Sequence, residues 1–121
     1  MIQLLVVDDS EMDRDIYQYA LKRQLKVPYH ITEVDDGKQG LAHMGEALDV
    51  VLIDYYLPDM TGLEFISQWR ESDKKTPLVM ISGQCDDNIM AAVMVAGATA
   101  YLVKESCSTG YLDKLVEMIT P

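Results

Sequence analysis

Short hydrophobic runs alternate along this chain with longer segments in which apolar residues recur every three or four positions. Continuous apolar runs are typical of buried parallel strands, and the longer periodic segments are typical of amphipathic helices. The runs predict strands at Ile2–Val7, Tyr29–Val34, Val50–Asp54, Leu78–Ser82 and Ala100–Val103. Strict alternation of strand and helix predicts an α/β fold with a doubly wound, five-stranded parallel sheet and helices on both faces.

The segments after the strands predict five helices, several of which begin beside a residue that commonly caps a helix. They run from Ser10 to about Leu25, Gly37 to Glu46, Thr61 to Glu71, Asp86 to Gly97, and from Ser108 or Thr109 onward. The side chains that we expect to face inward are Met12, Ile16, Ala20 and Leu21; Leu63, Ile66 and Trp69; Ile89, Ala92, Val93 and Ala96; and Leu112, Leu115, Val116 and Ile119.

The composition of the strands predicts their order in the sheet. The second strand is the most polar, which suits an edge, whereas the first, third and fourth are the most apolar and belong in the centre. This pattern fits the flavodoxin-like order 2-1-3-4-5, whose switch point lies between the first and third strands. At 121 residues, we expect one domain that covers residues 1–121.

Charge and composition exclude several classes of function. The net charge of −10 argues against direct nucleic-acid binding, because phosphate neutralisation needs clusters of Lys and Arg. No apolar run approaches the length of a membrane span, and no basic leader precedes Asp8, so we expect a cytoplasmic protein without a membrane segment. Cys85 and Cys107 lack the spacing of a zinc site, and we expect no disulfide between them in a reducing compartment.

Polar side chains follow four of the predicted strands at the point where each strand ends. Asp8 and Asp9 follow the first strand, Asp54 ends the third, Ser82 ends the fourth and Lys104 follows the fifth. Open α/β sheets bind ligands at this edge, so these side chains should meet. Three crowded carboxylates repel one another by roughly 4 kcal/mol per pair at ~4 Å and an effective dielectric constant of 20. Such a cluster needs a proton or a cation, and Mg²⁺ suits oxygen ligands with a phosphate nearby.

The same residues could carry out phosphoryl transfer. Lys104 and Ser82 can donate hydrogen bonds to phosphoryl oxygens, and Asp54 can act as a nucleophile that forms an aspartyl phosphate. By contrast, we interpret Asp35, Asp36 and Asp59 as solvated loop carboxylates.

Taken in order, these motifs resemble those of the receiver domains of two-component response regulators, over essentially the whole chain. The matching segments are residues 6–10, 52–62, 80–83 and 100–104. The resemblance implies that Asp54 accepts a phosphoryl group from the phosphohistidine of a sensor histidine kinase or a phosphotransfer protein. It also implies a phosphoacceptor that assists its own phosphorylation and dephosphorylation, not a conventional enzyme.

The resemblance assigns the remaining roles. Mg²⁺ would be held by Asp9, Asp54 and the backbone carbonyl of Tyr56, with Asp8 acting mainly through a metal-bound water. Ser82 and Lys104 would bind the phosphoryl oxygens, and Tyr101 would turn inward as Ser82 moves. Tyr56 and Gln84 would tune the rate of dephosphorylation.

One position departs from the family pattern, because Glu105 follows Lys104 where receivers usually carry a proline. A cis peptide bond before a residue other than proline costs about 3–4 kcal/mol, so we expect a trans bond here.

Other functions of the same fold fit the sequence less well. A flavodoxin-like cofactor binder would need a phosphate loop rich in Ser, Thr or Gly after the first strand, where this chain has acids. An aspartyl-phosphate phosphatase would need a second aspartate at Tyr56, and the chain carries no P-loop motif. A receiver that has lost phosphorylation is disfavoured because every chemical residue is present.

The fourth predicted helix is apolar almost all round. After its inward stripe is assigned, Met90, Ala91, Met94 and Val95 remain on other faces. A helix apolar on every side needs a partner to cover it. We therefore expect helix four, strand five and helix five to form the interface of a homodimer or of a fused output domain.

Overall fold

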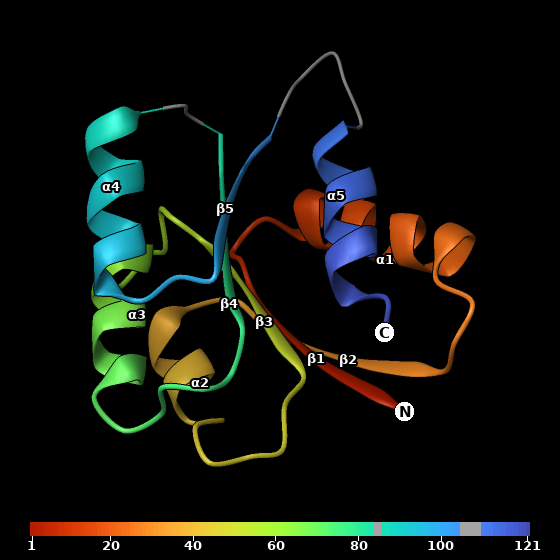
Figure 1. The fold of residues 1–121 in the computed structure, drawn as a ribbon, viewed down its shortest axis with the longest axis horizontal. Coiled ribbons are helices and arrows are strands. Elements are labelled where there is room, and N and C mark those ends of the chain that lie inside the picture. The colour runs from red at the N-terminus through yellow and green to blue at the C-terminus, as the bar shows by residue number, and fades with distance from the viewer. Residues whose placement is uncertain (84–85, 105–109) are drawn as a thin grey trace.

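The computed structural model describes residues 1–83, 86–104 and 110–121. Strands and helices alternate along these residues (Figure 1). The strands are β1 (Ile2–Val7), β2 (Tyr29–Val34), β3 (Val50–Asp54), β4 (Leu78–Ser82) and β5 (Ala100–Val103). Each begins and ends at the predicted residue, because polar residues or proline border most of the hydrophobic runs and favour loops.

All neighbouring strands are parallel, and their order is β2-β1-β3-β4-β5. The predicted fold class and strand order are confirmed. The polar β2 lies at an edge and is only partly buried, whereas every residue of β4 is buried. Burial on both faces is what the continuous apolar runs require.

The helices form a layer on each face of the sheet (Figure 1). They are α1 (Glu11–Gln24), α2 (Gly37–Leu41), α3 (Gly62–Arg70), α4 (Asp87–Ala96) and α5 (Gly110–Ile119). One hydrophobic cluster joins α1 and α5 to the sheet, and a second joins α3 and α4 to its opposite face. No helix in the described part of the chain is long and apolar enough to cross a membrane.

Capping residues set several helix starts as predicted. The side chains of Ser10, Thr61 and Asp86 each accept a hydrogen bond from a backbone N–H in the first turn that follows. Gly97 ends α4 in the left-handed conformation, with φ of 120°. The predicted caps Ser108 and Thr109 lie outside the described residues.

The second helix is shorter than predicted, because it ends at Leu41 instead of Glu46. The N–H groups of His43 and Met44 bond to carbonyls only three residues earlier, which is the geometry of tight turns. Gly45 then adopts a positive φ of 91°, which turns the chain away from the helix axis.

Two residues predicted to face inward lie on the surface. Met12 is 72% exposed and Ala92 is also exposed. On α1 the buried position belongs to Tyr17, which is 2% exposed. Met12 precedes Tyr17 by five residues, which places it about 140° away around the helix. On α4, Val93 is fully buried, and Ala92 lies on the solvent side of it.

Asp36 and Asp59, which the sequence places in loops as solvated carboxylates, also accept hydrogen bonds from backbone N–H groups. Asp36 caps α2 by accepting a hydrogen bond from the Gln39 N–H at 2.8 Å. Asp59 accepts from the N–H groups of Gly37 and Lys38 at 2.8 and 2.9 Å. Burial alone would raise the pKa of Asp59, but these two N–H groups lower it below its ordinary value. Asp59 therefore ties the loop before α3 to the start of α2.

Candidate functional site

The carboxyl ends of β1 and β3 bring three acids together. Asp8 and Asp9 directly follow β1, and Asp54 ends the neighbouring β3. One carboxylate oxygen from each of the three lies within 4.8 Å of the others. Asp8 is 1% exposed, the side chain of Asp54 is 14% exposed, and Asp9 is open to solvent. The sequence prediction that these residues meet at one sheet edge is confirmed.

Helix α1 and its cap hold Asp8 in place. The Ser10 N–H donates to Asp8 Oδ1 at 2.9 Å, and the Tyr17 hydroxyl donates to Oδ2 at 3.3 Å. Arg14 Nη1 donates to the backbone carbonyl of Asp8 at 2.6 Å. A buried carboxylate needs such donors, because an unpaired buried charge is costly.

The Lys104 ammonium lies among the carboxylates. Its Nζ atom lies 3.2 Å from Asp54 Oδ1, 3.3 Å from Asp8 Oδ2 and 2.7 Å from Asp13 Oδ2. The predictions placed Lys104 at this edge but missed Asp13. The available signal was its position as an acid in the first turn of α1, a few residues after the end of β1.

Ser82 joins this edge from β4. It is 2% exposed, and its carbonyl accepts a hydrogen bond from the backbone N–H of Lys104 at 2.7 Å. The parallel pairing of β4 with β5 places Ser82 opposite Val103, one residue before Lys104. The two predicted phosphoryl-binding residues are therefore tied together through the backbone.

Burial and charge set the acidity of the site. Burial raises the pKa of Asp54 to about 6, against the opposing charge of Lys104, and the charges of Asp8 and Asp9 add to the rise. Burial also raises the pKa of Asp8. For Lys104, burial alone would lower the pKa, but the hydrogen bond to Asp13 and the charges of Asp54 and Asp8 outweigh it and raise the pKa.

This donor set fits a hard divalent cation. Crowded carboxylate oxygens are the ligands that Mg²⁺ prefers, and one Lys104 ammonium does not balance the three acids at the strand ends. Raised carboxylate pKa values are the electrostatic sign of a site that a cation would stabilise. Asp8, Asp9 and Asp54 are the residues that could hold it.

The other predicted residues lie around this centre. Tyr56 is 56% exposed and stacks edge-on against Tyr55, with ring centroids 4.8 Å apart. Tyr101 is half-buried on β5 and packs against the core cluster shared with α3 and α4. Gln84, Cys85, Cys107 and the peptide bond between Lys104 and Glu105 lie outside the described residues.

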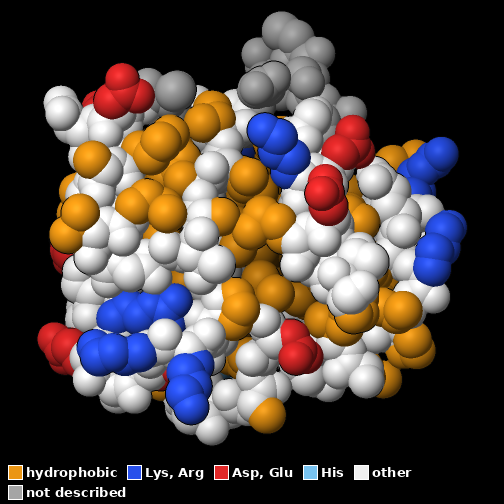
Figure 2. Space-filling view, viewed as in Figure 1, with side chains coloured by type: hydrophobic (Ala, Val, Ile, Leu, Met, Phe, Trp, Pro, Cys, Tyr) orange, Lys and Arg blue, Asp and Glu red, His pale blue; other side chains and the backbone are white. Residues whose placement is uncertain are grey.

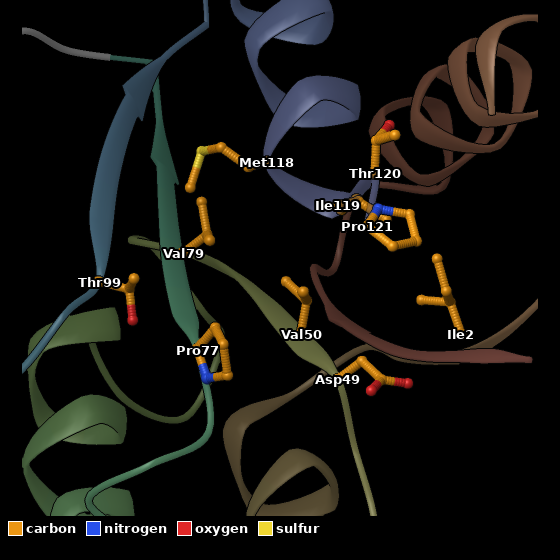
Figure 3. Close-up of a pocket in the computed structure, with 10 residues that line it drawn as sticks. All are labelled: Ile2, Asp49, Val50, Pro77, Val79, Thr99, Met118, Ile119, Thr120 and Pro121. Carbon is orange, nitrogen blue, oxygen red and sulfur yellow. The ribbon is translucent and has the colours of Figure 1, made fainter.

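A shallow apolar hollow of about 420 Å³ lies at the opposite edge of the sheet, near the starts of the strands (Figure 3). Ile2, Val50, Val79 and Met118 line it. Its acid, Asp49, accepts a hydrogen bond from the Gln3 N–H at 2.7 Å. The hollow shares no residue with the carboxylate cluster and contributes nothing to it.

Comparison with known proteins identifies the family. The family model described as the response regulator receiver domain matches residues 4–119. The chain belongs to this family. Receiver domains are phosphoacceptors in two-component signalling and not conventional enzymes. The match therefore decides for a receiver, and against the cofactor binder and the phosphatase that the fold alone left open.

Among curated relatives, the two-component response regulator ORR11 of Oryza sativa is 34% identical over 105 residues, which are 84% of this chain and 69% of ORR11. ORR7 of the same species is 32% identical, and the matched segment is only 49% of its length. The matched segment thus covers about half of the length of several relatives.

Solved structures agree with this assignment. The chemotaxis response regulator CheY4 of Vibrio cholerae shares 30% identity, with a TM-score of 0.82 over 98% of both chains. The Mn²⁺-bound form of the response regulator Rcp1 has a TM-score of 0.82 over 98% of this chain and 91% of Rcp1. Its identity is 23%, so that likeness concerns the fold alone.

Proposed function

We propose that residues 1–121 form a single receiver domain that accepts a phosphoryl group on Asp54. The donor is the phosphohistidine of a sensor histidine kinase or a phosphotransfer protein. A carboxylate oxygen of Asp54 bonds to phosphorus as the bond from phosphorus to the histidine nitrogen breaks, and its electron pair leaves with the imidazole. The observation that carries this proposal is the position of Asp54, which lies beside two further carboxylates and 3.2 Å from the Lys104 ammonium.

In this proposal Asp9, Asp54 and the Tyr56 carbonyl hold Mg²⁺. The ion supplies positive charge that offsets the repulsion between a phosphoryl group and the acids. Asp8 already accepts hydrogen bonds from Ser10, Tyr17 and Lys104, which supports an indirect role through a water on the ion.

Lys104 and Ser82 bind the phosphoryl oxygens. Lys104 brings a point charge and Ser82 a hydroxyl donor, and charge-assisted hydrogen bonds of this kind are roughly twice as strong as neutral ones. Both residues end strands at the same edge, and their backbones are linked by a 2.7 Å hydrogen bond. This arrangement supports their action as a pair.

Tyr101 would transmit a movement of Ser82 to the surface of the domain. Tyr101 lies on β5, and it belongs to the cluster that packs α4 against the sheet. Hydrophobic side chains gather over α4 and along the strip between α4 and α5 (Figure 2). Met94 is 42% exposed and Val95 is 89% exposed. We assign the face made by α4, β5 and α5 to a homodimer or a fused output domain.

Phosphorylation by a small donor tests the proposed function directly. Wild-type protein incubated with Mg²⁺ and acetyl phosphate should gain one phosphoryl group per chain, and Asp54→Ala should gain none. Asp87→Ala, which removes an exposed acid from the first turn of α4, serves as a matched control and should be labelled like wild type. Equal labelling of wild type and Asp54→Ala would overturn the assignment.

A further inference from the structure

The Lys104 ammonium makes its shortest contact with Asp13 on α1, and not with an acid at the strand ends. The contact with Asp13 is 2.7 Å, whereas those with Asp54 and Asp8 are 3.2 and 3.3 Å. Only the first has the length of a strong charge-assisted hydrogen bond. An ammonium has three N–H donors, so these three carboxylates engage all of them.

A second residue of α1, Tyr17, also lies beside this ammonium. Tyr17 lies one turn after Asp13 on the same face of the helix, and its ring centre is 6.0 Å from Lys104 Nζ. Tyr17 is 2% exposed, and its hydroxyl donates to Asp8. The backbone N–H of Asp13 donates to the Ser10 hydroxyl at 3.2 Å, which fixes the turn that carries the carboxylate. The side chain of Lys104 is only 17% exposed within this enclosure.

We propose that Asp13 is a positioning residue that holds Lys104 toward α1 and competes with the phosphoryl group for its ammonium. This inference rests on the proposed function and deepens it. A phosphoryl group on Asp54 brings new acceptor oxygens, and Lys104 must release one carboxylate to donate to them. Asp8 and Asp54 belong to the carboxylate cluster that fits a metal, whereas Asp13 is not part of it. A bound cation would offset the charges of Asp8 and Asp54 but not the charge of Asp13. Asp13 would therefore still attract the Lys104 ammonium and slow phosphoryl transfer to Asp54.

Asp13→Asn tests this competition because it removes the charge and keeps the size of the side chain. The control is Asp15→Asn, which makes the same charge change at an exposed position on the same helix. With Mg²⁺ and acetyl phosphate, no kinase docking surface enters the measurement. Asn can still accept from Lys104, but a hydrogen bond to a neutral acceptor is roughly half as strong, so phosphorylation of Asp54 should be roughly three- to tenfold faster in Asp13→Asn. Asp15→Asn should react at the wild-type rate.

A double-mutant cycle shows whether the effect passes through Lys104. In a Lys104→Met background, Asp13→Asn should change the rate less than twofold. An equal acceleration in both backgrounds means that the carboxylate acts by its charge alone, and it overturns the proposal. An unchanged rate for Asp13→Asn in the wild-type background overturns it as well.

A second measurement does not depend on phosphorylation. In protein labelled with ¹⁵N-lysine, the Nζ resonance of Lys104, assigned with Lys104→Met, should shift in Asp13→Asn and stay unchanged in Asp15→Asn. If acetyl phosphate fails to label even wild type, the proposed function fails, and this resonance still decides whether Asp13 holds the lysine. A Lys104 resonance that is identical in wild type and Asp13→Asn overturns the inference.

Discussion

Asp54 gains its chemical character from its surroundings. Burial and the neighbouring acids raise its pKa to about 6, yet a carboxyl with that pKa is mostly ionised at neutral pH and so remains available as a nucleophile. The repulsion from Asp8 and Asp9, which adds to the effect of burial on this pKa, also favours the entry of a cation. Asp54 is thereby a better acceptor of both a proton and a metal ion than an exposed loop aspartate.

We expect Tyr56 to shield a phosphoryl group on Asp54 from water. It lies two residues beyond Asp54, and its ring, 56% exposed, is braced edge-on by Tyr55. Tyr56→Ala should therefore speed the loss of phosphate at least severalfold, because water then reaches the acyl phosphate freely. The decay of radiolabelled phosphoprotein after removal of the donor measures this rate.

Tyr19→Ala is the matched control for that experiment, since Tyr19 is a 63% exposed tyrosine on α1. It should leave the decay unchanged. If Tyr56→Ala also decays at the wild-type rate, Tyr56 does not shield the site.

At the scale of elements, the strands could be predicted because strands buried on both faces read as continuous hydrophobic runs. The site residues could be predicted because they stand at the ends of these runs. The end of α2 could not, because it depends on Gly45 and on tight turns that no periodicity marks. Asp13 and Tyr17 were missed for a related reason. Their role depends on how α1 lies against the end of β5, which is a tertiary contact and not a local pattern.

The turn between α3 and β4 depends on one carboxylate, Asp73. Its oxygens accept hydrogen bonds from the N–H groups of Lys75 and Thr76, the Thr76 hydroxyl and the indole of buried Trp69. Asp73→Ala should lower the free energy of unfolding by about 1–3 kcal/mol, because the part-buried donors of Trp69 and Thr76 lose their acceptor. Urea unfolding followed by Trp69 fluorescence measures it. Glu71→Ala, an exposed acid at the end of α3, should cost much less.

The effect of Asp73 should depend on pH. The hydrogen bonds from Thr76, Lys75 and Trp69 lower the pKa of Asp73 in the folded protein below its ordinary value of 3.8. A lowered pKa means that the ionised group stabilises the fold above about pH 4 and that this stabilisation is lost as the pH falls toward the folded pKa. The difference between wild type and Asp73→Ala should therefore shrink at pH 3. A difference that grows on acidification would contradict this sign.

At the scale of the whole molecule, repulsion among Asp8, Asp9 and Asp54 destabilises the fold, and a bound cation should offset it. Mg²⁺ at ten times its dissociation constant should stabilise the fold by about 1.4 kcal/mol, since the ion binds only the folded state. For a domain of this size, that is a rise of a few degrees in Tm, measured by calorimetry at constant ionic strength. Asp9→Ala should raise Tm without metal and reduce the response to Mg²⁺. A Tm that millimolar Mg²⁺ leaves unmoved argues against the metal site.

The surface over α4 is apolar and partly exposed. This helix buries Val93 fully, yet it leaves Met94 42% and Val95 89% exposed, beside the hydrophobic strip along β5 (Figure 2). The described residues leave these apolar side chains at the surface (Figure 2), and exposed apolar patches mark interaction sites. Met94→Glu should weaken phosphorylation-dependent dimerisation or binding of the output partner, because it places a charge in that contact.

Phosphate uptake by Met94→Glu should stay at the wild-type rate, because Met94 lies exposed on α4 and is not one of the residues of the carboxylate cluster. Analytical ultracentrifugation of the beryllofluoride-activated protein and pull-down of its output partner measure the binding. Met12→Glu makes the same change at a 72% exposed methionine on α1 and controls for added charge. If Met12→Glu abolishes the association and Met94→Glu does not, the interface lies on α1, and the strip over α4 and β5 has another purpose.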